Sequence, residues 1–199
     1  MAAGTSIGAA DGQRYTRVAI TLHWVIAAAI AFNLWLGLGH DALPRNWQVM
    51  PVHKAVGITI LALTLVRIGW RSTHPVPAPP RDIPVWQQRA ASATHVLFYV
   101  LLLAIPLTGW AMSSGPNPRP LTWFGLVDIP YLPVSERVGG LGHDAHGVLA
   151  WAMIALIVLH VAAALRHHFG LRDDVLARMI PFFGVRADTA GRGNNSRAG

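Results

Sequence analysis

The chain has 199 residues, of which 53% are hydrophobic and only 13% are charged, whereas a typical soluble domain is roughly 25% charged. Because cysteine is absent, the composition excludes disulfide bonds, cysteine-ligated metals and thioether-linked cofactors. The net charge of +7 does not indicate nucleic-acid binding, because the basic residues lie at the ends of apolar segments rather than on one helix face.

Four apolar segments predict transmembrane helices, at about residues 18–38, 52–70, 90–112 and 142–165. Each is close to the roughly 20 residues that cross the hydrocarbon core of a bilayer as a helix. A soluble bundle is the alternative, but its helices would carry a polar stripe, and residues 148–159 contain no polar side chain. We therefore expect an all-α integral membrane protein built as a four-helix bundle.

The spans also predict how the rest of the chain is divided. Residues 14–183 form one membrane domain, between an N-terminal extension at 1–13 and a flexible, Gly-rich tail at 184–199. After the last span, residues 169–183 mix apolar side chains with arginines, which predicts an amphipathic helix at the membrane interface.

The basic residues predict the orientation in the membrane. Four spans put both termini on one side, and twelve of the sixteen basic residues fall on that side: Arg14, Arg17, Arg67, Arg71, Arg81, Arg89, Arg166, Arg172, Arg178, Arg186, Arg192 and Arg197. The other four fall on the opposite side: Arg45, Lys54, Arg119 and Arg137. Because loops rich in Lys and Arg stay in the cytoplasm, both termini are expected to be cytoplasmic.

Five histidines inside the spans fall at two depths. His23, His95 and His160 each lie six residues inside an arginine at the cytoplasmic boundary, which is about 9 Å of helix. His53 and His146 begin the second and fourth spans, near the opposite face. An ionisable side chain inside a membrane is a functional candidate by default. A single such histidine is as readily explained by a hydrogen bond between two helices. Five histidines at two matched depths favour a cofactor site instead.

The fourth span contributes one histidine to each layer. His146 and His160 are 14 residues apart, so they are separated by about 21 Å and lie within about 40° of the same helix face. Both imidazoles therefore point into the bundle, where such helices bind cofactors. This spacing predicts two stacked haems. His53 supplies the second ligand of the outer layer, and either His23 or His95 supplies that of the inner layer.

Other chemistry has less support in the sequence. No His-Glu-x-x-His motif and no carboxylate cluster occurs within the spans, which disfavours a zinc hydrolase. An ion or proton transporter usually has Asp or Glu inside the membrane, and all nine acidic residues here lie at or beyond the span ends.

Short motifs in a fixed order resemble the bacterial cytochrome b561 family, the four-helix di-haem cytochromes of the bacterial inner membrane. They are RYTR at 14–17, LHW at 22–24, VHKAVG at 52–57, ATHVLFY at 93–99, HGVLA at 146–150, LHVAAALRHH at 159–168 and LARMIP at 176–181. The resemblance covers residues 14–181 at natural spacing. Each motif is weakly specific alone, whereas the ordered set is strongly specific.

The resemblance implies two haem b groups, the inner one held by His23 and His160 and the outer one by His53 and His146. It leaves His95 as a second-shell or quinone-site residue, and Lys54, directly beside an outer ligand, is the other candidate for such a role. The implied function is that of an oxidoreductase of the respiratory chain, which passes electrons from superoxide or another donor to ubiquinone. The alternative is a haem b anchor subunit of a dehydrogenase or hydrogenase, whose partners would be other subunits.

Overall fold

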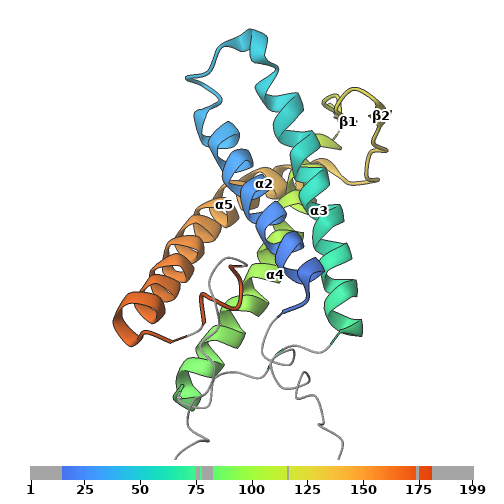
Figure 1. Cartoon of the computed structure of the whole chain (residues 1–199). Helices are drawn as coiled ribbons and strands as arrows, with labels where there is room; N and C mark the ends of the chain where they lie inside the picture. The colour runs from blue at the N-terminus through green and yellow to red at the C-terminus, as the bar shows by residue number, and fades with distance from the viewer. Residues whose placement is uncertain (1–14, 75–76, 78–82, 116, 174, 181–199) are drawn as a thin grey trace, which may run out of the picture.

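The computed structural model describes residues 15–74, 77, 83–115, 117–173 and 175–180. The four predicted spans are confirmed as the helices α2 (Arg17–Gly39), α3 (Val49–Thr73), α4 (Val85–Ser113) and α5 (Glu136–Leu165). All four are long and apolar enough to cross a membrane. The all-α membrane class is therefore confirmed (Figure 1).

Two of the helices begin at least five residues earlier than the apolar segments predict. α4 starts at Val85 and α5 at Glu136, rather than near residues 90 and 142. The extra turns contain polar residues, which a helix tolerates where it leaves the hydrocarbon. Capping fixes the true start of α5, where the Ser135 hydroxyl accepts a hydrogen bond from the Val138 N–H. Hydropathy alone marks the edge of the lipid and not the end of the helix.

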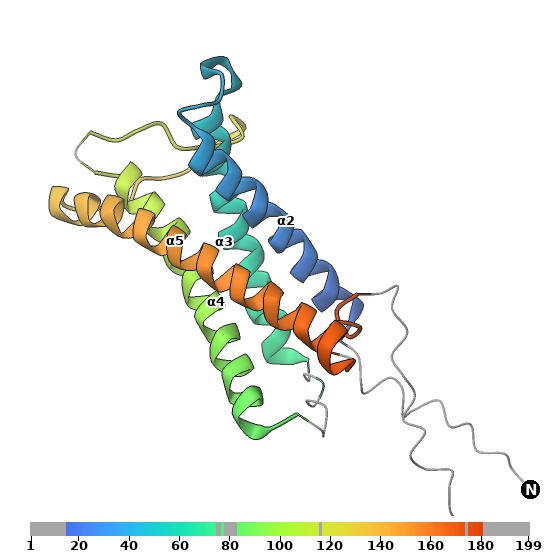
Figure 2. The same cartoon turned by 90° about the vertical axis from the view of Figure 1, so that its left-hand side faces the viewer.

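The helices pack as neighbours along the chain. α2 lies along α3, α3 along α4 and α4 along α5, while neither α2 nor α3 packs closely along α5 in the part of the chain that is described. One end of the bundle carries the start of α2 and α4 and the end of α3 and α5 (Figures 1 and 2). We call this the terminal end and the opposite one the loop end.

An apolar cluster fills the middle of the bundle. Its buried members are Ile26, Val56, Ile60, Leu101, Leu102, Met153 and Leu156. On α5, the buried Met153 and Leu156 lie between His146 and His160 along the sequence. The cluster therefore separates the two histidine layers, and many large apolar side chains on the outer faces remain exposed for contact with lipid, such as Val148 at 69% and Trp151 at 64%.

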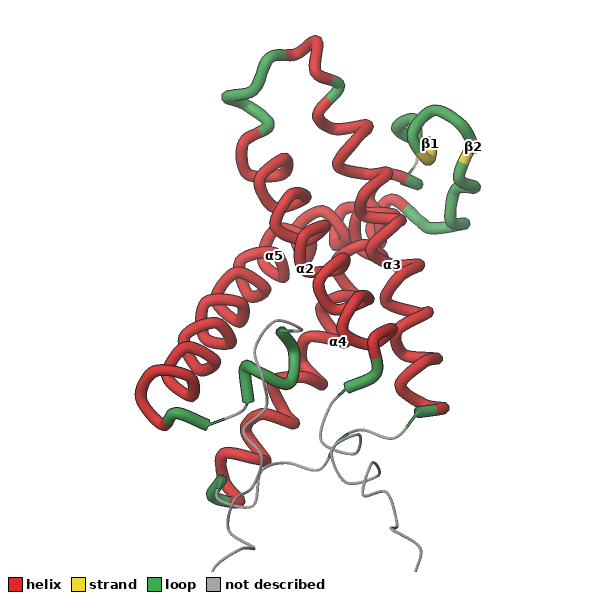
Figure 3. Tube along the Cα trace, in the orientation of Figure 1, coloured by secondary structure: helices red, strands yellow, loops and turns green. Residues whose placement is uncertain are grey.

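The loop end is covered by the connection between α4 and α5. It includes two short antiparallel strands, β1 (Thr122–Trp123) and β2 (Val127–Asp128), visible in Figure 3. The Trp123 Nε1–H donates to the Thr59 hydroxyl at 3.0 Å and the Lys54 ammonium donates to the Pro120 carbonyl at 2.8 Å. Both bonds tie this connection to α3, next to His53.

The segment after α5 differs from the prediction of an amphipathic helix. α5 continues as the π-helix η2 (Arg166–Leu171), and residues 175–179 then form turns. The helix stops because Arg172 takes a left-handed conformation, with φ at 55°. The Met179 carbonyl accepts a hydrogen bond from Trp24 of α2 at 2.8 Å, so this segment folds back onto the bundle. The predicted extension at 1–13 and tail at 184–199 lie outside the described residues.

Candidate haem-binding site

The outer histidines face one another across the bundle. His53 lies in the second turn of α3 and His146 in the third turn of α5, and both are half-buried. Their ring centroids are 6.0 Å apart. They come from two helices that do not pack closely along each other, so the two imidazoles meet across the interior of the bundle.

Each outer imidazole is held by a backbone carbonyl. His53 places Nδ1 3.1 Å from the Asn33 carbonyl oxygen of α2, and His146 places Nδ1 2.9 Å from the Ile105 carbonyl oxygen of α4. In this arrangement each Nδ1–H donates, which leaves the Nε2 lone pair as the metal-binding atom. A histidine that ligates a metal generally gives its other ring N–H to such an acceptor.

A glycine lies against each outer imidazole. A Cβ atom at Gly37 of α2 would lie 2.9 Å from Cε1 of His53, and one at Gly109 of α4 would lie 3.1 Å from Cε1 of His146. Real Cβ atoms essentially never lie as close as the first distance, and the second is tighter than nine in ten real Cβ contacts. A larger residue at Gly37 would push the His53 ring out of position, and one at Gly109 would force the His146 ring to shift by a few tenths of an ångström.

The inner layer brings together three histidines. The His160 ring of α5 has its centroid 6.4 Å from that of His23 on α2 and 6.0 Å from that of His95 on α4. Phe98, one turn after Thr94 on α4, packs edge-on against His160 at 5.3 Å. The ring distances do not decide between His23 and His95 as the partner of His160, which is the alternative that the residue spacing leaves open.

These separations fit a metal bound between two imidazoles. A metal–imidazole bond is about 2 Å, and the ring centre lies roughly 1 Å behind its nitrogen, so two axial ligands of one iron have centroids roughly 6 Å apart. The outer pair at 6.0 Å matches, and so do both candidate inner pairs, His23 with His160 at 6.4 Å and His95 with His160 at 6.0 Å. The donor set is neutral imidazole in an apolar bundle, which is the environment of bis-histidine haem.

The remaining described histidines have other surroundings. His40 is exposed and lies next to Asp41, with its Nε2 3.2 Å from the carboxylate. His143 is exposed at the loop end. His74 stacks on Trp70 with centroids 3.7 Å apart, and His167 contacts the Asp173 carboxylate. His168 packs edge-on against Phe169, with centroids 4.8 Å apart. These five are thus distinct from the two layers.

Sequence reasoning did not identify the residues that support the outer ligands. Gly37 and Gly109 contact the imidazole rings, and the carbonyls of Asn33 and Ile105 hold them. Backbone carbonyls carry no sequence signal. The available signal in the sequence is a glycine on a neighbouring helix, at the same depth in the membrane as a predicted ligand. That signal can be interpreted only when the packing of the helices is known.

Comparison with known proteins finds relatives of the chain among bacterial cytochromes. A family model described as prokaryotic cytochrome b561 matches residues 14–182. The chain is 31% identical over 173 residues to cytochrome b561 homolog 2 of Escherichia coli, covering 84% of this chain and 92% of that protein.

Two further relatives cover a similar share of the chain and carry different names. Cytochrome b562 of Cereibacter sphaeroides is 31% identical over 177 residues, covering 83% of this chain and 94% of its own length. A Yersinia pestis protein named probable superoxide oxidase is 30% identical over 179 residues, covering 85% of this chain and 97% of its own length.

Proposed function

Since the chain belongs to the prokaryotic cytochrome b561 family and is a membrane b-type cytochrome, we propose that it binds two b haems and transfers electrons across the bacterial inner membrane. The observation that carries this proposal is the pair of histidine layers, with ring separations of 6.0 Å and 6.4 Å. A haem bound in each layer supplies a one-electron carrier whose potential depends on axial ligation, burial and hydrogen bonding.

The chain's own residues hold, orient and enclose these sites. His53 and His146 are the proposed outer ligands, oriented by the Asn33 and Ile105 carbonyls. A carbonyl that accepts the Nδ1–H raises the electron density of the imidazole and fixes its tautomer. The apolar cluster between the layers keeps water out of the path.

His23 and His160 are the proposed inner ligands, with His95 as a neighbour that contributes to a quinone site. The family resemblance supports His23, and the helix packing agrees with it. α2 and α5 do not pack closely on each other, as is required of helices that hold a flat group between them, whereas α4 and α5 pack directly. The outer ligands likewise come from α3 and α5, two helices that are not close neighbours.

The proposed reaction takes electrons from superoxide at the loop end and delivers them to ubiquinone at the terminal end. Two superoxide anions each lose one electron and become dioxygen, and one quinone gains both electrons with two protons. The similarity to the probable superoxide oxidase supports this donor. Lys54 adds a physical reason, because it follows the outer ligand His53 and donates to the carbonyl of Pro120, the neighbour of Arg119. Two positive charges near an outer ligand attract a small anion.

Reversing the charge at Lys54 is expected to slow the reduction of the haems by superoxide. Lys54→Glu lowers the rate by about tenfold at low ionic strength, because electrostatic steering contributes roughly that much or more to association. The effect shrinks in high salt, where the screening length is only about 3 Å at 1 M. The measurement is stopped-flow absorbance of the reduced haem.

The controls separate steering from damage to the haem. Arg137→Glu changes an exposed charge at the same end, on the first turn of α5, and is expected to have little effect. Reduction by a small neutral reductant stays unchanged in both variants. If superoxide does not reduce the haems of the unmodified protein, the reaction is wrong, and the protein is then a haem b anchor subunit of a dehydrogenase or hydrogenase.

The orientation of the protein in the membrane follows from the distribution of its basic residues. We propose that the terminal end faces the cytoplasm, because the order of the spans along the chain assigns twelve of the sixteen basic residues to that side. A phosphatase fused after Gly199 is expected to be inactive and one inserted at Asn117, in the exposed connection at the loop end, to be active. A green fluorescent protein at the same two sites gives the opposite pattern. Reversed signals would place the outer histidines in the cytoplasmic half.

A further inference from the structure

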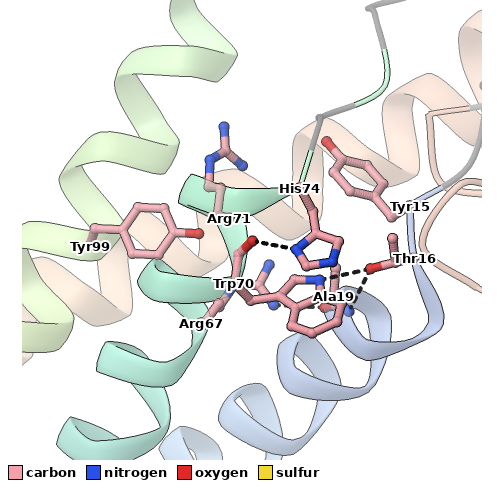
Figure 4. Close-up of a pocket in the computed structure, with 8 residues that line it drawn as sticks. All are labelled: Tyr15, Thr16, Ala19, Arg67, Trp70, Arg71, His74 and Tyr99. Atoms are coloured by element: carbon pink, nitrogen blue, oxygen red, sulfur yellow. Dashed lines mark hydrogen bonds between the residues drawn. The ribbon is translucent and has the colours of Figure 1, made fainter.

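A pocket lies at the terminal end of the bundle, between the start of α2, the end of α3 and the inner part of α4 (Figure 4). Its lining combines two arginines with aromatic side chains, namely Arg67, Arg71, Tyr15, Trp70, His74 and Tyr99. None of these is a proposed haem ligand. Trp and Tyr gather where a membrane protein meets the lipid headgroups, so the pocket has the composition of the membrane interface.

One wall of the pocket is fixed in place by side-chain contacts. The Trp70 Nε1–H donates to the Thr16 hydroxyl at 3.0 Å, and that hydroxyl also caps α2 by accepting from the Ala19 N–H at 3.2 Å. The Trp70 ring stacks on His74, with centroids 3.7 Å apart and planes within 10°. The wall is therefore built before any ligand binds.

The pocket holds the positive charge of two arginines, and no carboxylate of the described residues pairs with either. Arg67 and Arg71 are four residues apart on α3, which places both on one helix face. Arg67 donates one N–H to the Ala19 carbonyl at 2.8 Å, and a guanidinium has further N–H donors to offer. Among the described residues, no carboxylate lies within 4.0 Å of either arginine.

Two hydroxyl groups complete the donor set. Tyr15 at the start of α2 and Tyr99 on α4 both line the pocket, and within the described part of the chain neither hydroxyl has a hydrogen-bond partner. Figure 4 shows the Tyr99 hydroxyl pointing from α4 toward α3. Two guanidinium groups and two hydroxyls around one open pocket suit an anion with several oxygen atoms.

We propose that this pocket binds the phosphate of an anionic phospholipid headgroup from the leaflet at the terminal end. Arginine binds phosphate oxygens through two parallel hydrogen bonds, and basic pockets between transmembrane helices are typical headgroup sites. A quinone is neutral and would leave both arginine charges unbalanced. A bound headgroup joins α2, α3 and α4 at the end where α4 has no close contact with α2. The proposal goes beyond electron transfer and does not depend on the number of haems.

The test compares lipids on the haem-loaded protein in neutral detergent. Phosphatidylglycerol is expected to remain bound in native mass spectrometry and to raise the melting temperature, while phosphatidylcholine at the same concentration does neither. Arg71→Gln weakens phosphatidylglycerol binding by about fivefold, since one basic residue near the membrane surface contributes about that much. Arg71→Lys keeps the charge and restores part of the affinity. Arg89→Gln, an exposed arginine on α4 at the same end, is the matched control and changes nothing.

Each of four results would overturn the proposal. Equal binding of phosphatidylglycerol and phosphatidylcholine removes the preference for an anion, and equal stabilisation by inorganic phosphate shows an ion site rather than a lipid site. Competition by a short-chain ubiquinone analogue assigns the pocket to quinone. If Arg71→Gln loses haem absorbance but keeps its lipid preference, the arginines serve the cofactor. The lipid comparison on the unmodified protein remains decisive even if a variant fails to fold.

Discussion

His146→Ala is expected to lower the haem content of the purified protein from about two to about one per chain, because it removes one axial ligand of the proposed outer site. The expected loss is large because His146 is the proposed ligand on α5 and its Nδ1 also forms the hydrogen bond to the Ile105 carbonyl that orients it. Haem per chain is measured by pyridine haemochrome absorbance, and the spin state by electron paramagnetic resonance.

The control for this variant is close by on the same helix. His143 lies three residues earlier on α5 but is exposed, and His143→Ala is expected to retain both haems. His160→Ala is expected to lose the inner haem instead, leaving the outer spectrum unchanged. Two low-spin, six-coordinate haems in either the His146 or the His160 variant would contradict the ligand assignment.

The same measurement separates the two candidates for the second inner ligand. The ring centroids of His23 and His95 lie 6.4 Å and 6.0 Å from that of His160, so these distances do not favour either candidate. His23→Ala is expected to lose the low-spin signal of the inner haem, whereas His95→Ala keeps it and alters quinone reduction. The opposite pattern would make His95 the ligand and move the inner haem between α4 and α5.

Gly37→Ala is expected to weaken haem binding at the outer site by about ten- to a hundredfold, the usual cost of disturbing the support of a metal ligand. The new Cβ would lie 2.9 Å from Cε1 of His53, so the imidazole must turn away and lose its hydrogen bond to the Asn33 carbonyl. Gly109→Ala acts on His146 in the same way, with a smaller effect because the contact is 3.1 Å. Haem transfer to apomyoglobin measures both losses.

A glycine in open space provides the matched control. A Cβ at Gly147, beside His146 on α5, meets nothing within 4 Å, and neither does one at Gly69 on α3. Both alanine variants are expected to hold haem normally and to gain up to about 1 kcal/mol of helix stability. If Gly37→Ala and Gly147→Ala retain haem equally well, the contact between Gly37 and His53 has no role in the site.

The sequence alone determines the properties that depend on distance along one helix. The four spans follow from the length of each apolar segment, and the two histidine layers follow from a fixed rise of about 1.5 Å per residue. His146 and His160 therefore define two levels and one face of α5 without any knowledge of the other helices. The start of α4 at Val85 was not visible in this way, because apolarity reports the lipid boundary and not the helix end.

The tertiary structure decides everything that depends on how helices pack against one another. It brings His53 to a carbonyl 20 residues away and His146 to one 41 residues away, and it sets Gly37 and Gly109 against their rings. It also gathers Arg67, Arg71 and Tyr99 from α3 and α4 around one pocket. Rotation and crossing of each helix in lipid are set by contacts with its neighbours. Such contacts cannot be predicted from distances along one helix, because they depend on how the whole bundle packs.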